Sequence, residues 1–273
     1  MQLKNSDFKI NLLSVVVPAY KQEKTIIKDI KNINDSLNTL GIKYEIIVVV
    51  DGILDQTYNK ALKFKSAKVK VMGYDKNQGK GHAIRYGMMH AKGDVIGFID
   101  AGMDINPSGF KMLISHMEWY NADVIVGSKL HPVSKVVYPM WRKILSWGYR
   151  FLTKRLFGFK VRDTQVGLKF FKRDVIKKAL PRLLVKAYAF DIEILAVVYR
   201  LGYKRIYEAP IEINFRTNTI PSFSFGLWKT IFLMFWDTLA VFYRLKILKY
   251  YDKSSKNKLI TNPQVREVRI HAR

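Results

Sequence analysis

Short runs of β-branched residues recur in the first half of the chain, and they constrain its fold more than any other feature. The clearest run is Ile46-Ile47-Val48-Val49-Val50, which would be apolar on both faces of a strand. Such runs are typical of strands that are buried on both sides in a parallel sheet. Helix-like segments such as 23–40 and 81–91 separate them. The alternation predicts an α/β fold, in which right-handed crossovers join a mostly parallel central sheet to flanking helices.

The order of the elements follows from the same pattern. We expect strands at residues 14–18, 45–51, 68–73, 95–100 and 123–128. In the second half we expect helices at 140–157 and 190–201, a loop that enters a strand at 163–171, and a strand at 204–213. Ligands of parallel sheets bind beyond the carboxyl ends of the strands, and Asp51 and Asp100 lie at two such ends.

Basic charge is concentrated in the second half of the chain. The net charge is +25; residues 1–129 hold 18 Lys and Arg against 13 Asp and Glu, whereas residues 130–273 hold 29 against 9. Such a field attracts polyanions, which include nucleic acid, anionic lipid and phosphorylated substrates. The absence of Cys excludes disulfides, thiol catalysis and thiolate metal sites. The five His are too scattered for a helical zinc site.

Residues 227–250 mix apolar and aromatic side chains with the charges of Lys229, Asp237 and Arg244. A membrane-spanning helix needs about 20 predominantly apolar residues, and a central Asp is costly there. The charges share one side of a helix, so we expect an amphipathic helix in a membrane interface, followed by basic residues near anionic headgroups. Its apolar side would hold Trp228, Phe232, Phe235, Leu239 and Phe242. The alternative is a terminal helix packed on the protein's own core.

Three further segments bear on how the chain is organised. Residues 1–7 lack the apolar stretch of a signal peptide, so we expect no export. Residues 215–222 interrupt any regular pattern and suggest a hinge. Residues 253–273 are rich in basic side chains and are expected to form a flexible tail.

Two strand ends carry side chains suited to a nucleotide. Pro18-Ala19-Tyr20 gives the first strand a rigid aromatic lip on which a nucleobase could rest, and Glu23 follows it. Proline also commonly ends strands without any such role. Asp51 could accept hydrogen bonds from a base or ribose, or it could organise a strand–turn–helix junction with Gly52. Asp55 is expected to cap the following helix.

The segment Asn77-Gln78-Gly79-Lys80-Gly81 opens the expected helix at 81–91. Two glycines and a lysine at a helix N-terminus can approach a diphosphate. The segment is not a Walker loop, because it lacks the longer glycine spacing and the Ser or Thr. We therefore expect Lys80 to contact a diphosphate.

Asp100 ends a hydrophobic strand, and Asp104 follows four residues later. Carboxylates in this position suit Mg²⁺ or Mn²⁺ bridged to a diphosphate, because hard cations take oxygen ligands. Asp104 and Asn106 could instead begin the next helix, with Pro107 at its first position. We expect Asp100 to hold the metal, and Asp104 has either role open to it.

Basic and polar side chains gather in two later segments. Arg142 and Ser146 are four residues apart on one helix face, where a cation and a hydroxyl could clamp a phosphate, with Lys129 before them. The alternative for such a pair is an ordinary solvated face. Residues 162–169 form a polar loop that includes Asp163 and Gln165, which indicates a sugar- or phosphate-binding site or a plain turn.

In this order the motifs resemble those of glycosyltransferase family 2, whose members have the Rossmann-like GT-A fold. More narrowly, about residues 12–215 resemble the polyprenyl-phosphate branch, the dolichyl-phosphate glucose and mannose synthases. Pro18–Tyr20 is similar to the family's Pro-x-Tyr, with Lys21 where Asn is usual. Asn77–Gly81 and Asp163–Lys169 resemble loops of the glucose-transferring members. The segment Phe190-Asp191-Ile192-Glu193 is similar to the family's Phe-Asp-x-Glu, in which capping and packing are as plausible as catalysis.

Two family motifs are reduced in this chain. Asp-Asp-Gly-Ser is reduced to Val50-Asp51-Gly52-Ile53, and the metal motif Asp-x-Asp is reduced to Asp100-Ala101-Gly102. The resemblance implies Mg²⁺ or Mn²⁺ at Asp100 and Asp104, and Gly102 in place of the second Asp puts the need for a metal in doubt.

The resemblance also implies roles for the remaining motif residues. The nucleotide-sugar site would comprise Pro18, Tyr20, Glu23, Asp51, Lys80, Asp100 and Gln165. The acceptor-phosphate site would comprise Lys129, Arg142 and Ser146, and catalysis would depend on Asp100, Asp163 and Arg142. Residues 1–215 would form the GT-A catalytic domain, 216–252 a membrane-interface helical region, and 253–273 the tail.

The activity implied by the resemblance is inverting transfer of glucose or mannose from a nucleoside diphosphate sugar to a polyprenyl phosphate, either dolichyl or undecaprenyl. UDP-glucose is slightly favoured over GDP-mannose by the two glucose-type loops. The protein would lie at the cytoplasmic face of a membrane, peripheral or monotopic, and bind its anionic surface. Because a phosphate acceptor is already ionised, it needs no strong general base.

Two other functions remain open at this stage. A family 2 enzyme that extends a glycan hydroxyl would need a carboxylate base such as Asp191 or Asp163. A non-catalytic GT-A protein that binds membranes or polyanions is favoured by Gly102. No nucleic-acid partner is expected, because no helix-turn-helix, zinc-finger or RNP pattern is present. The sequence does not fix the oligomeric state.

Overall fold

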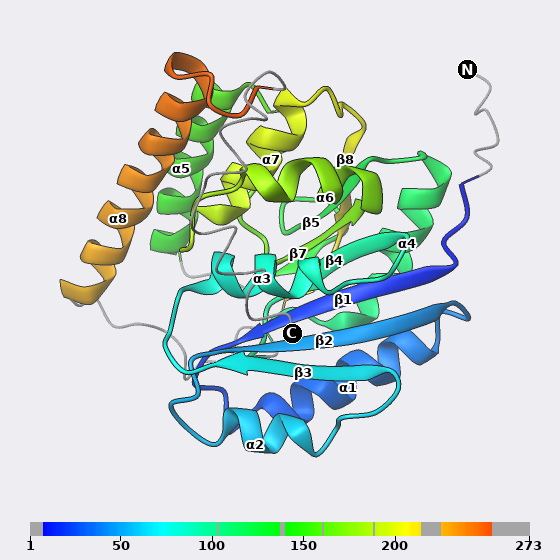
Figure 1. Ribbon diagram of the computed structural model, residues 1–273. Helices are drawn as coiled ribbons and strands as arrows, with labels where there is room; N and C mark the ends of the chain where they lie inside the picture. Colours follow the sequence, from blue (N-terminus) through cyan, green and yellow to red (C-terminus); the bar gives the residue numbers. More distant parts are fainter. Residues whose placement is uncertain are drawn as a thin grey trace.

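A computed structural model describes residues 8–102, 104–136, 140–159, 161–187, 189–213 and 225–252 (Figure 1). Within these ranges, residues 135–136, 140–145 and 225–230 are described by their backbone alone. Three predictions lie outside the described residues: the missing signal peptide at 1–7, the hinge at 215–222 and the tail at 253–273.

Seven strands form a central sheet in the order β3-β2-β1-β4-β7-β5-β8, and β6 and β9 form a separate pair. Among the described strands of the central sheet, β7 alone runs antiparallel to its neighbours. The predicted, mostly parallel sheet is therefore confirmed. The strands are β1 (Leu12–Ala19), β2 (Lys43–Asp51), β3 (Val69–Tyr74), β4 (Val95–Ile99), β5 (Val124–Ser128), β6 (Lys135–Val136), β7 (Leu168–Lys172), β8 (Ile206–Pro210) and β9 (Glu212–Ile213).

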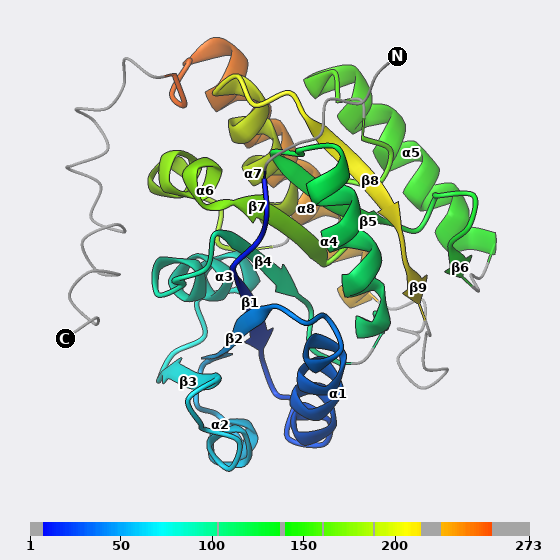
Figure 2. The same cartoon turned by 90° about the vertical axis from the view of Figure 1, so that its right-hand side faces the viewer.

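Helices cover both faces of the sheet, with α1 and α4 on one side and α3, α6 and α7 on the other (Figure 2). The helices are α1 (Ile26–Asn38), α2 (Thr57–Leu62), α3 (Lys80–Met89), α4 (Phe110–Trp119), α5 (Met140–Phe157), α6 (Arg173–Ala179), α7 (Phe190–Arg200) and α8 (Phe225–Phe242), with 3-10 turns at Pro107–Gly109 and Leu180–Arg182. The expected helices are thus present, with ends shifted by a few residues.

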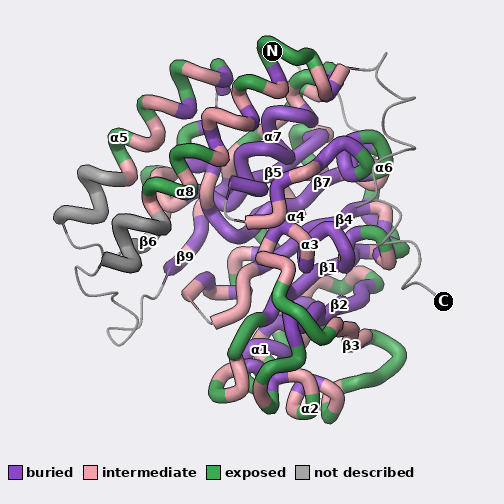
Figure 3. Tube along the Cα trace, turned by 60° about the vertical axis from the view of Figure 1, so that its left-hand side comes forward, coloured by how far each residue is buried: buried purple, intermediate pink, exposed green. Residues whose placement is uncertain are grey.

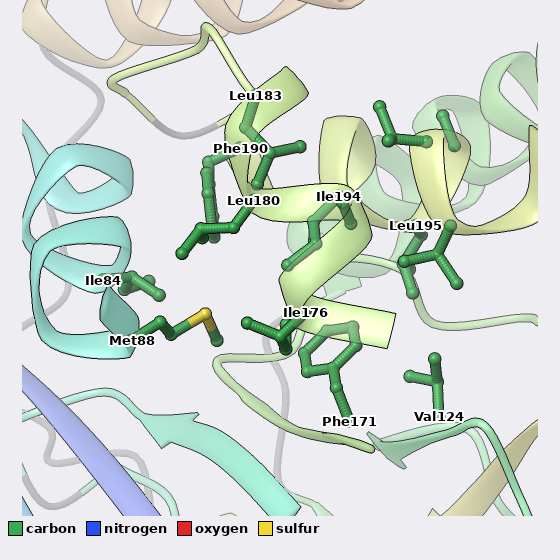
Figure 4. Close-up of a cluster of buried hydrophobic side chains, with 14 of the residues drawn as sticks. Ile84, Met88, Val124, Phe171, Ile176, Leu180, Leu183, Phe190, Ile194 and Leu195 are labelled. Atoms are coloured by element: carbon green, nitrogen blue, oxygen red, sulfur yellow. The ribbon is translucent and has the colours of Figure 1, made fainter. Parts of the chain in front are cut away.

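The two-sided burial of the strands explains the apolar runs. In β1, Val16 packs with α3 and α7, whereas Val15 and Val17 pack into the layer that contains α1 and α4. Successive side chains of a strand point to opposite faces, so a strand buried on both faces must be apolar throughout. Figure 4 shows one of the two layers, in which Phe171 of β7 lies beside Ile176 of α6 and below α7.

The predicted strand at 204–213 is wrong in one respect, because it is two strands. β8 pairs with β5 as far as Pro210, and β9 pairs with β6 from Glu212 onward. Proline has no N–H to continue a ladder, which suits it to the point where the chain leaves the sheet.

The predicted helix at 227–250 is also divided. The α-helix α8 ends at Phe242 and continues as a π-helical turn at Tyr243–Ile247. One side packs on the protein: Thr238, Val241 and Leu245 are buried, and the Thr238 hydroxyl lies 2.7 Å from that of Tyr149 on α5. Figures 1 and 3 show α5 and α8 side by side.

The other side of α8 is apolar and exposed. It presents Phe232, Phe235 and Trp236 to solvent, and Tyr243 of the π-helical turn is exposed as well. Phe242, predicted on this side, instead packs against the Phe157 ring, with centroids 6.2 Å apart. The helix therefore combines features of the two alternatives: one face packs on the protein's own core, and the other face is apolar and points outward, as in an interfacial helix. Trp228 and Lys229 are described by their backbone alone. Among the described helices, none has the length and apolar content needed to cross a bilayer.

The end of the described chain is fixed to α7. Tyr251 is fully buried, and its hydroxyl donates to Glu193 Oε1 at 2.6 Å. Arg200 forms a bidentate ion pair with Asp252, at 2.6 and 2.8 Å. Burial raises the pKa of Glu193, and hydrogen bonds from Tyr251 and from backbone amides oppose the rise. Glu193 thus has the packing role that the sequence left open for it.

Candidate functional site

Two adjoining cavities open at the carboxyl ends of β1, β2 and β4, and Asp100 and Ala101 line both. The larger, of about 450 Å³, lies over β1 and the start of α3. The smaller, of about 190 Å³, extends toward β5 and the loop before β7. The first is lined by Pro18, Ala19, Tyr20, Gln22, Asp51, Asn77, Gly79, Lys80, Asp100, Ala101 and Ala187. The second is lined by Asp100, Ala101, Asp104, Ile105, Lys129, Gln165, Val166, Gly167 and Ile213.

Asp51 at the end of β2 organises the loop before α3. Its Oδ1 accepts hydrogen bonds from the Tyr74 hydroxyl at 2.8 Å and the Gln78 amide at 2.7 Å. Its Oδ2 accepts from Asn77 Nδ2 and from the Gly79 amide, both at 2.9 Å. The buried carboxylate thus accepts hydrogen bonds from four donors of the protein, and in this way it organises the strand–turn–helix junction. A contact between Asp51 and a base or ribose stays a prediction.

Replacing Asp51 with Asn is expected to destabilise the protein by about 1–3 kcal/mol, because an amide NH₂ would face donors that now meet an oxygen. The matched control is Asp55→Asn. Asp55 Oδ1 accepts a hydrogen bond at 2.9 Å from the amide of Thr57, the first residue of α2, so Asp55 serves the start of this helix as predicted, one residue before the N-cap position Gln56. Asn caps helices as well as Asp does, so the control should be near neutral. Equal shifts of the two urea midpoints would contradict the role of Asp51.

The glycines of the loop serve packing more than diphosphate approach. Gly79 has a φ of +102°, and a Cβ there would lie 2.4 Å from the Lys186 carbonyl oxygen. The amides of Gly81 and His82 donate to that same oxygen, at 2.7 and 3.3 Å. A neighbouring loop therefore already occupies these two amides, and a contact between this segment and a diphosphate stays a prediction.

Lys80 is the charged residue that the loop brings to the larger cavity, which Asn77 and Gly79 also line. Its ammonium lies 2.9 Å from Asp100 Oδ2 and 3.2 Å from Asp191 Oδ2. The other oxygen of Asp191 receives the ammonium of Lys169, which is completely buried. Lysines and carboxylates thus alternate in one chain of contacts, from Lys169 through Asp191 and Lys80 to Asp100.

This alternation shapes the charges of the site. Burial alone would lower the pKa of Lys80, but Asp100 and Asp191 outweigh it and raise the pKa, so Lys80 stays protonated. Burial raises the pKa of Asp100, and Lys80 opposes this rise. Burial lowers the pKa of Lys169 against the attraction of Asp191. Removing Asp191 would leave the buried ammonium of Lys169 without its carboxylate partner.

Two buried polar atoms at the cavities lack a partner within the described part of the chain. They are Asp100 Oδ1 and Gln165 Nε2. Buried polar atoms are nearly always hydrogen-bonded, so an unpaired acceptor and an unpaired donor at one site indicate a ligand. Gly167 fits closely against Asp100, since a Cβ on Gly167 would lie 1.8 Å from Asp100 Oδ2.

The donor set for a divalent cation is small. Asp100 and Asp104 line the smaller cavity together, but among the described residues no group of three or more His, Asp or Glu is suited to a metal. Gly102 has a φ of +108°, and its amide donates to Asp29 Oδ2 at 3.1 Å, so an Asp in its place would be strained. Asn106 caps the 3-10 turn that begins at Pro107, which agrees with the alternative left open for Asn106, and Asp104 is not part of this cap.

The remaining predicted residues are only partly brought together. Lys129 lines the smaller cavity, and its amide donates to Asp163 Oδ2 at 2.9 Å. Glu23 lines neither cavity and instead accepts a hydrogen bond from the Gln56 amide. Ser146 lies half-buried on α5, and Arg142 is in the first part of that helix, which is described by backbone alone. The phosphate clamp of Arg142 and Ser146 thus stays a prediction.

Sequence reasoning missed two contributors to the site. Lys169 was part of a motif, but nothing local signalled that it pairs with Asp191, 22 residues away. Ala187 reaches the larger cavity because the loop before α7 folds over α3, more than 100 residues away in sequence. The available signal was a lysine between the apolar residues of a buried strand, here Lys169 in β7.

A family model of glycosyl transferase family 2 matches residues 14–180, and the chain belongs to this family. Two similar curated relatives are dolichyl-phosphate beta-glucosyltransferases. The Drosophila melanogaster protein is 34% identical over 205 residues, which cover 69% of this chain and 63% of the relative. The human protein is 34% identical over 221 residues, which cover 74% of this chain and 66% of the relative. The chain thus spans slightly under two thirds of both relatives.

Similar solved structures show the fold. Glucosyl-3-phosphoglycerate synthase from Mycobacterium tuberculosis, solved with Mn²⁺, UDP and phosphoglyceric acid, is 20% identical with a TM-score of 0.64, over 85% of this chain and 78% of that one. Mannosyl-3-phosphoglycerate synthase from Rubrobacter xylanophilus is 18% identical with a TM-score of 0.64, over 89% of this chain and 76% of that one. The predicted GT-A fold is therefore confirmed.

Proposed function

We propose that the protein transfers glucose, with inversion, from UDP-glucose to a polyprenyl phosphate. The similarity to dolichyl-phosphate beta-glucosyltransferases supports glucose over mannose and a lipid phosphate over other acceptors. The paired cavities support a two-substrate reaction, because a donor in the larger cavity and an acceptor in the smaller one would meet at Asp100. Pro18, Tyr20, Asp51 and Lys80 would then surround the nucleotide-sugar.

The observation that carries the proposal is that neither candidate base has a carboxylate free for proton transfer. Both oxygens of Asp191 are engaged, one by Lys169 and one by Lys80. Asp163 is buried, and its two oxygens face the amide and the ammonium of Lys129, the latter at 3.8 Å. A hydroxyl acceptor must lose a proton to a base, whereas an ionised phosphate need not. The site thus favours the phosphate acceptor.

The residues of this chain would act by position and charge. Lys80 would approach the leaving diphosphate while Asp191 holds it in place. Lys129, with Arg142 and Ser146, would orient the acceptor phosphate, and Gln165 Nε2 would donate to the sugar or to that phosphate. A bound Mg²⁺ or Mn²⁺, held by Asp100 and Asp104 with phosphate oxygens and water as further ligands, would neutralise charge on the leaving diphosphate.

The reaction would take place at a membrane surface, with the protein peripheral or monotopic on its cytoplasmic face. The exposed aromatic side of α8 supports contact with lipid through the region 216–252, and residues 1–215 would then form the catalytic domain. This arrangement would bring a membrane-bound acceptor to the basic half of the chain.

The test is transfer of radiolabelled sugar to a short polyprenyl phosphate in detergent, followed by extraction into organic solvent. Label from UDP-glucose should appear in a lipid product, in a β-linkage to phosphate, whereas GDP-mannose should give none. A glycan acceptor in place of the lipid serves as the comparison. Transfer to the glycan alone, or no transfer from either donor, would overturn the proposal.

A further inference from the structure

A third cavity, of about 740 Å³, lies on the outer side of α5 and shares no lining residue with the two cavities at Asp100. It is formed by one face of α5 and by the segment that leads from α5 toward β7. Its lining consists of Trp147, Arg150, Phe151, Lys154, Gly158, Phe159, Val161 and Arg162. The catalytic scheme uses none of these side chains.

Three cations surround this cavity, and among the described residues no carboxylate lines it. Arg150 Nε donates to the Ser146 carbonyl oxygen at 3.1 Å, which fixes the guanidinium on the helix. The backbone amide of Arg162 donates to Glu208 Oε1 at 3.0 Å, which fixes the segment that carries the third cation. Lys154 lies on the same face of α5, one turn after Arg150. The arrangement is a basic pocket in which the Arg150 guanidinium and the backbone at Arg162 are held by hydrogen bonds, and three cations at one cavity suit a phosphate group.

Two exposed aromatic rings lie beside the cations. Trp147 and Phe151 are each 64% exposed, and their rings stack with centroids 6.1 Å apart. They do not belong to the core face of α5, which packs through Tyr149 and Phe157 against α8. A soluble anion would leave these rings exposed to water, whereas a lipid has a phosphate that can contact the cations and apolar chains that can contact the rings.

We propose that this cavity binds the phosphate headgroup of an anionic membrane phospholipid. Arg150, Lys154 and Arg162 would hold the phosphate, and Trp147 and Phe151 would enter the adjoining acyl boundary. The cavity lining includes none of the residues proposed for the acceptor phosphate, which are Lys129, Arg142 and Ser146, so this phosphate is distinct from the acceptor phosphate. The inference goes beyond the proposed function and does not depend on it, because it concerns lipid binding without turnover.

The test is flotation of the full chain with vesicles of phosphatidylcholine and phosphatidylglycerol in an about 3:1 ratio. Each basic side chain at an anionic surface strengthens binding about fivefold, so the variant Lys154→Gln/Arg162→Gln should bind about 25-fold more weakly. The matched control, Lys28→Gln/Lys31→Gln, removes the same charge from the exposed face of α1, which packs into a different buried layer from the end of α5. It should change binding less than about twofold.

Further measurements identify which ligand the cavity binds. Trp147→Ala should weaken binding to the same vesicles, and Trp119→Ala, which removes an equally exposed ring on α4, should not. Inorganic phosphate and glycerol 3-phosphate, titrated against the full chain in solution, should bind much more weakly than the vesicles do. Equal losses in both charge pairs would mean that net charge alone drives binding. Tight binding of the soluble phosphates, or no effect of the Lys154/Arg162 change, would also overturn the proposal.

Discussion

Replacement of Asp100 by Asn is expected to lower the initial rate of glucose transfer by about 10²–10³-fold, the usual cost of removing one electrostatic group from a reaction centre. Asp100 lines both site cavities together with Ala101, its Oδ2 pairs with Lys80, and its Oδ1 has no partner among the described residues. Asn keeps the size that the contact with Gly167 demands and removes only the charge. The rate is measured at saturating donor and acceptor.

The fold should survive this change, because Lys80 keeps its second partner, Asp191. Urea unfolding of Asp100→Asn checks this, and Asp35→Asn on the exposed side of α1 is the control for a lost surface carboxylate. If Asp100 holds the cation, the residual activity of Asp100→Asn should no longer rise with added Mn²⁺, whereas that of the control should. An Asp100→Asn protein with undiminished transfer would exclude Asp100 from the reaction.

Local patterns predicted the strands and the motif positions well, because both depend on neighbouring residues. The run from Ile46 to Val50 has to be buried on two faces, and its end therefore places Asp51 at the sheet edge. Asp100 follows β4 in the same way. Ligands of parallel sheets bind beyond the carboxyl ends of the strands, so the pattern placed the site at the sheet edge where Asp51 and Asp100 lie.

Contacts between distant segments could not be predicted in this way. The Lys186 carbonyl oxygen, which occupies the amides at the start of α3, comes from a loop with no motif of its own. The pairing of Lys169 with Asp191 depends on how β7 inserts antiparallel between β4 and β5. The sequence pattern wrongly assigned Phe242 to the apolar outward side of α8, because its packing partner Phe157 lies on another helix, α5. In each case the role of the residue depends on a partner that is distant in the sequence and therefore absent from the local pattern.

The second large effect is expected from Asp191→Asn, which should lower the free energy of unfolding by about 3–5 kcal/mol. Lys169 is completely buried, and Asp191 is its carboxylate partner, so the variant leaves a buried ammonium without a counter-charge. Adding Lys169→Met removes that ammonium and should restore most of the lost stability. A double-mutant cycle from urea unfolding of the four proteins gives the coupling, which should exceed about 2 kcal/mol.

Dependence on pH separates a charge effect from a packing effect. Burial already lowers the pKa of Lys169, and losing Asp191 lowers it further. A lysine whose pKa is lower in the folded state destabilises the fold while it is protonated, and this penalty disappears as pH rises through its folded pKa. Asp191→Asn should therefore gain stability relative to wild type as pH is raised toward about 10, the ordinary lysine range. The double variant, which has no lysine at position 169, should not.

Activity distinguishes positioning from mere support of the fold. In the stable double variant, Lys80 keeps Asp100 but loses its ion pair with the second carboxylate, so transfer should stay at least about tenfold below wild type. Full activity in the double variant would mean that Lys169 and Asp191 serve stability alone. Additive losses of stability in the two single variants would mean that they do not act as a pair. Recovered stability with depressed transfer would identify Asp191 as a residue that positions Lys80.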